Sequence, residues 1–312
     1  MEAATATRTG VAARRGGVSA DKAERRLAVR MVAPSMILIA IVAAYPIGYA
    51  IWLSLNEYSV RVPGLSRWAG LRNYDTALSS DQFWSSFGNT LIFTVCSVAL
   101  ETVLGLAMAM AMHNAFKGRG ALRTIVLIPW AILTVVTAIT WQTIFDPTLG
   151  PVNTVLDSLG LPGSNTVWLG QTPQAMMVLI FADVWKTAPF MALLLLAGLQ
   201  VIPDDVYDAA KVDGATAWQR FVRITLPLLK PALLVALIFR TLDALRIFDL
   251  PFVLTKGANG TSTLSLIAYQ EFQQNRIIGL GSALSVLTFI IVMAVAFLYI
   301  RLIGGNIREL TK

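Results

Sequence analysis

Six long apolar runs are the feature that most constrains what this chain of 312 residues can fold into. They cover residues 32–55, 88–112, 125–145, 175–199, 232–254 and 279–302. A membrane crossing takes about 20 mostly apolar residues as a helix, because a helix pairs its own backbone groups in lipid. The runs therefore predict an all-α membrane protein with six transmembrane helices.

The charges agree with this prediction and orient it. Charged residues make up 14% of the chain, against about 25% in an average soluble protein, which excludes a soluble enzyme. A net charge of +7 could indicate nucleic-acid binding, but the basic residues are unevenly placed. Of the 25 lysines and arginines, seven lie in the N-terminal tail, three after the second run, four after the fourth run and three at the C-terminal end. The positive-inside rule places both termini in the cytoplasm and leaves membrane lipid, not nucleic acid, as the surroundings.

The domain organisation follows from the same runs. Residues 1–31 read as a basic, largely disordered cytoplasmic tail. The run that follows is too long for the apolar core of a signal peptide, so it is expected to remain as the first span. Residues 32–303 form the transmembrane domain, and residues 304–312 a cytoplasmic C-terminal tail.

The cytoplasmic segment 201–231 is too long for a simple turn between two helices. Pro203 and the acids after it are helix-start signals, and Asp213-Gly214 is a helix-end signal. A second short helix is predicted from Thr216 to Ile224, ending at Leu226-Pro227. The segment thus predicts an elbow of two short helices. On this pattern alone it could be an interfacial linker or a docking element.

The residues of this elbow resemble a known signature. Asp208-Ala209-Ala210, then Asp213-Gly214-Ala215 and later Leu226-Pro227, follow the E-A-A pattern of binding-protein-dependent ABC importer permeases, with aspartate in place of the usual glutamate. The chain is similar to the maltose-type sugar permeases, and within them it looks most like the trehalose importer permeases of actinobacteria.

The resemblance implies a type I permease fold and a set of partners. These are a second permease subunit, a cytoplasmic ATPase dimer that binds ATP and magnesium, and an extracellular sugar-binding protein that delivers a disaccharide such as trehalose. The elbow becomes the coupling helix that docks on the ATPase, through Asp208, Ala209, Ala210, Asp213, Gly214 and Ala215.

Several charged residues lie inside the predicted spans, where each is costly unless it faces a partner or a cavity. The fifth run carries Arg240, Asp243, Arg246 and Asp249, each three residues from the next. This stripe could be a structural ladder between helices, or it could line a polar passage. Lys186 lies too far from the cytoplasmic edge for its charge to reach water easily. For Glu101 in the second run, a hydrogen bond between helices is expected.

In maltose-type permeases, sugar contacts cluster in the span before the coupling loop and in the span after it. The resemblance carries this role to Lys186, Thr187, Phe190, Arg240, Asp243, Ala244 and Ile247. Arg240 and Asp243 bring charges that the maltose pattern lacks, which argues against maltose itself.

The sequence contains no G-x-x-x-x-G-K-[ST] phosphate loop and no cluster of catalytic or metal-binding motifs. We therefore expect no catalytic residue, metal or cofactor in this chain, and a transport role in place of an enzymatic one. External segments 56–87, 146–174 and 254–263 are expected to face the sugar-binding protein. The alternative is an ion-coupled secondary carrier that works without an ATPase. Such a carrier commonly has paired inverted repeats, and none is evident in the sequence.

Overall fold

The computed structural model describes residues 17–60, 66–113 and 118–310. The chain divides into two units, Met1–Trp52 and Leu53–Lys312. Most of the first unit is helix α1 (Gly17–Ser54), which contains Pro34 and Pro46. The helix begins earlier than predicted, because alanine, glutamate, arginine and leucine in its first turns favour helix. The prediction of disorder is therefore wrong for residues 17–31, and residues 1–16 lie outside the described part.

The described residues of the second unit form helices, their connections and one small hairpin, in which β1 (Asn56–Tyr58) pairs antiparallel with β2 (Ser66–Trp68). Its helices, in chain order, are α2 (Arg72–Leu78), α3 (Asp81–His113), α4 (Arg119–Ala131), α5 (Thr134–Ile144), α6 (Pro151–Ser158), η1 (Trp168–Gly170), α7 (Gln174–Leu199), α8 (Asp204–Val212), α9 (Ala217–Arg220), η2 (Phe221–Thr225), α10 (Leu226–Ala244), α11 (Asp249–Leu254), α12 (Leu264–Tyr269), η3 (Gln270–Gln274) and α13 (Ile278–Leu310).

The described residues contain five helices long and apolar enough to cross a membrane. A sixth crossing is possible if α4 and α5 count as one broken span, since they meet at an angle of 88°. This corrects the prediction of one continuous helix over residues 125–145. Pro129 lies near the end of α4, and Ile132 and Leu133 adopt extended backbone angles, both with ψ of 137°. Proline close to a helix end and an extended pair after it interrupt the helical hydrogen bonds.

The fifth predicted span is also interrupted. Helix α10 ends at Ala244, and α11 begins only at Asp249. Arg246 and Asp249 therefore do not continue the stripe of Arg240 and Asp243 along one helix. Of the two interpretations of the stripe, a ladder of four charges is wrong beyond its first pair.

Helix α7 forms the centre of the second unit, packed against α3, α4, α5 and α10. Its buried residues include Leu179, Met191 and Leu195, all with no exposed surface. Glycine allows α3 to approach it closely, because a Cβ on Gly105 would lie 2.6 Å from Met191 Cγ. Small residues of this kind are typical of helix contacts inside membranes.

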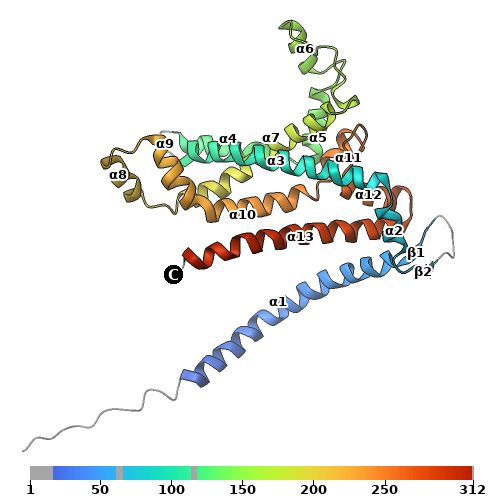
Figure 1. Cartoon of the computed structure of the whole chain (residues 1–312), viewed down its shortest axis with the longest axis horizontal. Coiled ribbons are helices and arrows are strands. Elements are labelled where there is room, and N and C mark those ends of the chain that lie inside the picture. Colours follow the sequence, from blue (N-terminus) through green and yellow to red (C-terminus); the bar gives the residue numbers. More distant parts are fainter. Residues whose placement is uncertain (1–16, 61–65, 114–117, 311–312) are drawn as a thin grey trace, which may run out of the picture. The chain divides into compact units, whose positions relative to one another are not determined.

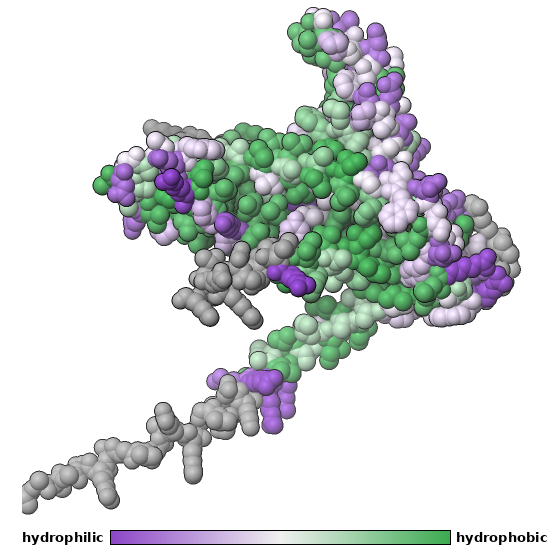
Figure 2. Space-filling view, viewed as in Figure 1, coloured by the Kyte–Doolittle hydropathy of each residue, from purple (hydrophilic) through white to green (hydrophobic). Residues whose placement is uncertain are grey.

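The second unit separates its polar ends from an apolar middle. In Figure 1, α8 and α9 lie at one end of α3, α7 and α10, and α2 lies at the other. Figure 2 shows hydrophobic surface along the middle of these helices and hydrophilic residues gathered near α8, near the hairpin and around α6. This arrangement is that of a membrane protein with two polar faces.

Candidate substrate pocket and coupling elbow

A buried ion cluster joins three helices of the second unit. Arg240 on α10 donates from Nε and Nη2 to the two carboxylate oxygens of Glu101 on α3, with the Nη2–Oε1 distance at 2.9 Å. The same Nη2 also donates to Asp183 on α7, and Nη1 donates to Asp243 over 2.7 Å. The Thr187 hydroxyl lies 2.6 Å from Glu101 Oε1 and 2.6 Å from the Asp183 carbonyl oxygen, so two acceptors share its proton.

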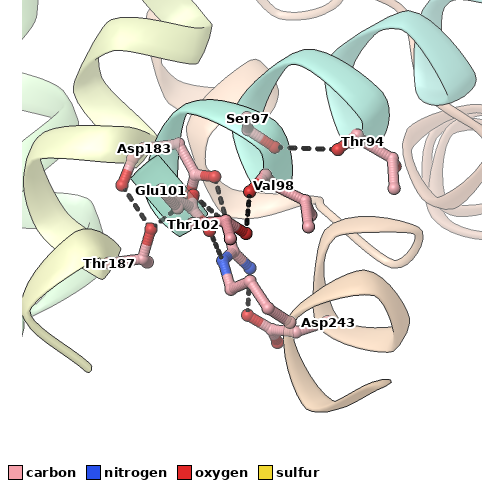
Figure 3. Close-up of polar contacts among 9 residues, drawn as sticks. Thr94, Ser97, Val98, Glu101, Thr102, Asp183, Thr187 and Asp243 are labelled. Atoms are coloured by element: carbon pink, nitrogen blue, oxygen red, sulfur yellow. Dashed lines mark hydrogen bonds and ion pairs between the residues drawn. The ribbon is translucent and has the colours of Figure 1, made fainter. Parts of the chain in front are cut away.

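Most of this cluster is closed to its surroundings. The side chains of Glu101, Asp183 and Arg240 are 0%, 4% and 3% exposed, whereas that of Asp243 is 70% exposed. Figure 3 shows Glu101, Asp183 and Asp243 gathered from their separate helices around one place, where all three carboxylates accept from the Arg240 guanidinium. A charge in such a place is stable only with a partner, so Arg240 and its two buried acids hold α3, α7 and α10 together.

A polar pocket of about 240 Å³ lies next to the cluster. Three acids and two bases line it together with hydroxyl and aromatic groups. The lining residues are Trp130, Thr134, Asp183, Lys186, Thr187, Asp243, Arg246, Ile247, Phe248 and Asp249. Asp243 accepts the hydrogen bond from Arg240 through Oδ2, and its Oδ1 accepts no hydrogen bond from the described residues. The pocket therefore offers a free carboxylate oxygen, cationic donors, hydroxyls and flat apolar rings within helices that can span a membrane.

The structure brings together four of the seven predicted pathway residues. Lys186, Thr187, Asp243 and Ile247 line the pocket. Arg240 and Ala244 are buried behind it. Phe190 does not line it either, because its ring stacks on that of Trp130 at 5.6 Å.

Sequence reasoning missed several residues of this region. Glu101 is an ion-pair partner of Arg240 and not only a hydrogen-bonding group. The lining residues outside the predicted pathway set include Trp130, Thr134, Asp183 and Phe248, whereas Arg246 and Asp249 belong to the stripe for which a polar passage was one interpretation. An arginine inside a span needs a carboxylate from another span, and this rule points to Glu101 and Asp183. Trp130 and Thr134 flank the helix break, for which Pro129 is the only signal in the sequence.

The elbow is built by local capping. Helix α8 has Asp204 and Asp205 in its first turn, which suits the helix dipole. At its other end the amide of Ala215 donates to the Ala210 carbonyl over 2.9 Å, and that of Gly214 donates to Lys211 over 3.1 Å. This pair of bonds is a Schellman cap.

A left-handed residue is required in that cap, and Gly214 has a φ of +76°. Thr216 and Gln219 then form a capping box at the start of α9. The predicted end of the first elbow helix at Asp213-Gly214 is confirmed.

The predicted end of the second elbow helix at Leu226-Pro227 is wrong. The chain continues from α9 through the π-helix η2 into α10 without leaving helical structure. In η2 the amide of Leu226 donates to the carbonyl of Phe221, five residues back, where an α-helix bonds four residues back. Such a wide turn relieves the clash that proline causes with the preceding turn.

The tip of the elbow is open to its surroundings. Asp208, Ala209, Asp213 and Gly214 are exposed, and Ala210 and Ala215 are half-buried. Large apolar side chains lie beside them, with Val212 88% exposed and Trp218 71% exposed. Tyr207 and Thr225 join the elbow to the base of α10 through a hydroxyl contact of 3.0 Å.

At the other end of the unit, Asp146 organises the turn between α5 and α6. Its Oδ1 accepts hydrogen bonds from the amides of Leu149 and Thr148 at 2.8 and 2.9 Å. These two bonds lower the pKa of the Asp146 carboxyl below its ordinary value. Among residues 17–60, 66–113 and 118–310, no group of three or more histidine, cysteine, aspartate or glutamate side chains is placed to hold a metal ion.

Comparison with known proteins places this geometry in a family. The chain is 46% identical to the trehalose transport system permease protein SugA of Mycobacterium tuberculosis, over 91% of this chain and 90% of the relative. It is 45% identical to the trehalose/maltose transport system permease protein MalF of Thermococcus litoralis, over 89% of this chain and 94% of that protein.

Solved structures agree on the fold. A chain of a bacterial ABC transporter involved in the import of the acidic polysaccharide alginate is similar with a TM-score of 0.77 and 26% identity, covering 95% of this chain and 99% of that one. Residues 101–308 match the family described as binding-protein-dependent transport system inner membrane component. This chain therefore belongs to that family, as a multi-pass ABC transporter permease subunit of the inner membrane with the type I fold, and not as an enzyme.

Proposed function

We propose that this chain is one of two permease subunits of an ATP-driven importer, and that the importer carries a disaccharide, with trehalose as the first candidate. The observation that carries the proposal is the polar pocket within membrane-spanning helices. Two relatives of the chain, 46% and 45% identical to it, are named for trehalose or trehalose/maltose transport, and they support the choice of sugar.

The lining of the pocket suits a neutral polyol. Asp243 Oδ1 can accept a hydrogen bond from a sugar hydroxyl, and the Thr134 hydroxyl can donate or accept one. The rings of Trp130 and Phe248 offer flat apolar faces to the C–H faces of a sugar ring. Pockets that bind small molecules commonly have volumes of about 300–1000 Å³. A volume of about 240 Å³ in one chain fits a pathway whose other half comes from a second permease subunit.

The elbow is proposed to be the coupling helix. A short capped helix with small residues at its tip can enter a cleft, and the exposed Val212 and Trp218 add apolar contact area beside the tip. Asp208, Ala209, Ala210, Asp213, Gly214 and Ala215 then contact a cytoplasmic ATPase dimer, which binds the ATP and magnesium.

Transport follows from these two sites by alternating access. A loaded sugar-binding protein docks on external segments such as the α5–α6 region, and ATP closes the ATPase dimer. The elbow transmits this closure to α7 and α10, which carry Asp183, Lys186, Thr187 and Asp243 of the pocket lining. The pathway opens outward to receive the sugar, and hydrolysis returns it to the inward-open state. Both termini then lie in the cytoplasm.

The test is purification of this chain from its native membrane, followed by identification of the subunits that copurify. The proposal expects a second permease, an ATPase and a sugar-binding protein. In the reconstituted complex, ATP hydrolysis is then measured with a panel of disaccharides and with an amino acid as control. Stimulation by a disaccharide such as trehalose supports the proposal. Copurification of the chain alone, or stimulation by the amino acid only, contradicts it.

A further inference from the structure

Lys186 makes an unusual pair of contacts for a lysine in the middle of a span. Its Nζ donates to the carbonyl oxygen of Ile132 over 2.8 Å and to that of Trp130 over 3.3 Å. In the described part of the chain, no carboxylate oxygen lies within 4.0 Å of this ammonium group. Of the three acids that line the same pocket, Asp183 and Asp243 are paired with Arg240 instead.

Both carbonyls belong to the break between α4 and α5. The last carbonyls of a helix have no partner within it, and inside a membrane no bulk water can replace one. A cation at the C-terminal end of a helix also suits the negative end of the helix dipole. Lys186 therefore supplies from α7 the hydrogen bonds that the 88° break removes from the backbone.

The position of Lys186 on α7 links this contact to the ion cluster. Residues 183, 186 and 187 are spaced three and four apart, which places them on one face of a helix. Asp183 binds Arg240 on α10, Thr187 binds Glu101 on α3, and Lys186 binds the end of α4. One face of α7 thus holds three neighbouring elements around the pocket.

We infer that Lys186 is a positioning residue for transport, which holds the α4–α5 break in place so that Trp130 and Thr134 form one wall of the pocket. The inference rests on the proposed function for its transport role. Two of the three ammonium protons are used by the break, so the main effect of Lys186 on the sugar passes through the wall and not through its own charge.

The test compares Lys186→Met, which is unbranched, one atom shorter and without donors, with Lys186→Arg, which keeps donors and charge. Lys230→Met is the matched control, because Lys230 is exposed and lies outside the pocket. If Lys186→Met does not assemble, Lys186→Leu, which also lacks donors, replaces it. Each variant is made in the complete transporter.

Transport kinetics give the first readout. Loss of charged hydrogen bonds of this kind corresponds to about a tenfold change in an equilibrium. Lys186→Met is therefore expected to raise the KM for sugar about tenfold with little change in kcat, while Lys186→Arg and Lys230→Met stay near wild type. An unchanged KM in Lys186→Met overturns the inference.

The second readout does not depend on transport. Cys96 is the only cysteine of this chain, so in a Cys96→Ser background Thr134→Cys is the one position of this chain that a water-soluble thiol reagent labels, and the label is read on this subunit after separation. Without sugar, Lys186→Met is expected to change the labelling rate severalfold, and Lys186→Arg to restore it. Equal labelling rates mean that Lys186 does not position the wall. If the wild-type complex takes up no sugar with ATP, the proposed function fails, while the labelling comparison still decides this inference.

Discussion

Replacing Arg240 by methionine is predicted to destabilise the folded chain by about 3–5 kcal/mol. The guanidinium is the ion-pair partner of Glu101 and Asp183, whose side chains are 0% and 4% exposed. Removing one member of a buried ion pair leaves its partner without compensation, and the two acids here depend on the same arginine. Asp243 adds at most about 1 kcal/mol, because it is 70% exposed.

Two controls separate this effect from the loss of any arginine in the span. Arg246→Met removes an arginine that is exposed and donates only to the Leu242 carbonyl over 3.2 Å among the described residues, so it is expected to cost less than about 1 kcal/mol. The triple variant Arg240→Met, Glu101→Gln, Asp183→Asn removes the arginine and both buried charges. It is expected to recover much of the loss, because neutral groups cost far less to bury than unpaired charges.

The assay is equilibrium unfolding of the purified protein in mixed micelles, with tryptophan fluorescence as the signal. The reasoning is refuted if Arg240→Met is as stable as Arg246→Met, or if the triple variant is as unstable as Arg240→Met alone. Either result would mean that the buried charges are not held by this arginine.

Three further predictions concern the elbow, the pocket and the external turn. Gly214→Asp is expected to abolish ATP-coupled uptake without loss of membrane insertion, whereas Gly118→Asp, at a residue outside the elbow with a positive φ of +97° and equally open space, leaves uptake intact; equal effects in the uptake assay contradict a docking role. Asp243→Asn is expected to raise the KM for sugar about tenfold, and an unchanged KM in the same assay argues against a sugar contact. The pKa of Asp146 is lower in the folded chain than its ordinary value of 3.8. The ionised carboxylate therefore stabilises its turn at a pH above 3.8, and this stabilisation is lost as the pH falls through the lowered pKa. Limited proteolysis after α5 is expected to increase below about pH 4 in wild type and to be independent of pH there in Asp146→Asn.

The fold could be predicted from local properties of the sequence. Apolar runs of sufficient length leave only a helix as a way to pair backbone groups in lipid, and the five long apolar helices of the described residues follow from this rule. The end of α8 could also be predicted from neighbouring residues, because Gly214 after Asp213 provides the left-handed residue that the cap requires.

The helix breaks depend on contacts that no local pattern records. The bend after α4 is stabilised by Lys186, which lies 54 residues after Ile132 in the chain. Pro129 marks the region, but proline is tolerated within other spans, as Pro46 and Pro189 are. The sequence could therefore indicate a weak point there but not an 88° bend.

The candidate site could be predicted only in part for the same reason. Arg240 pairs with Glu101 at a separation of 139 residues and with Asp183 at 57 residues. The spacing within the fifth run favoured pairs along one helix, and only the pair of Arg240 and Asp243 forms. The resemblance to sugar permeases identified the region, whereas the lining residues followed from the packing of α7.

The central proposal is that this chain imports a disaccharide through a separate ATPase, and one measurement tests it most directly. The complete transporter and the chain alone are each placed in liposomes, and uptake of labelled trehalose is measured with ATP or with a proton or sodium gradient. We predict uptake only in the complete transporter, only with ATP and the binding protein. Uptake by the chain alone under an ion gradient would contradict the account and indicate a secondary carrier.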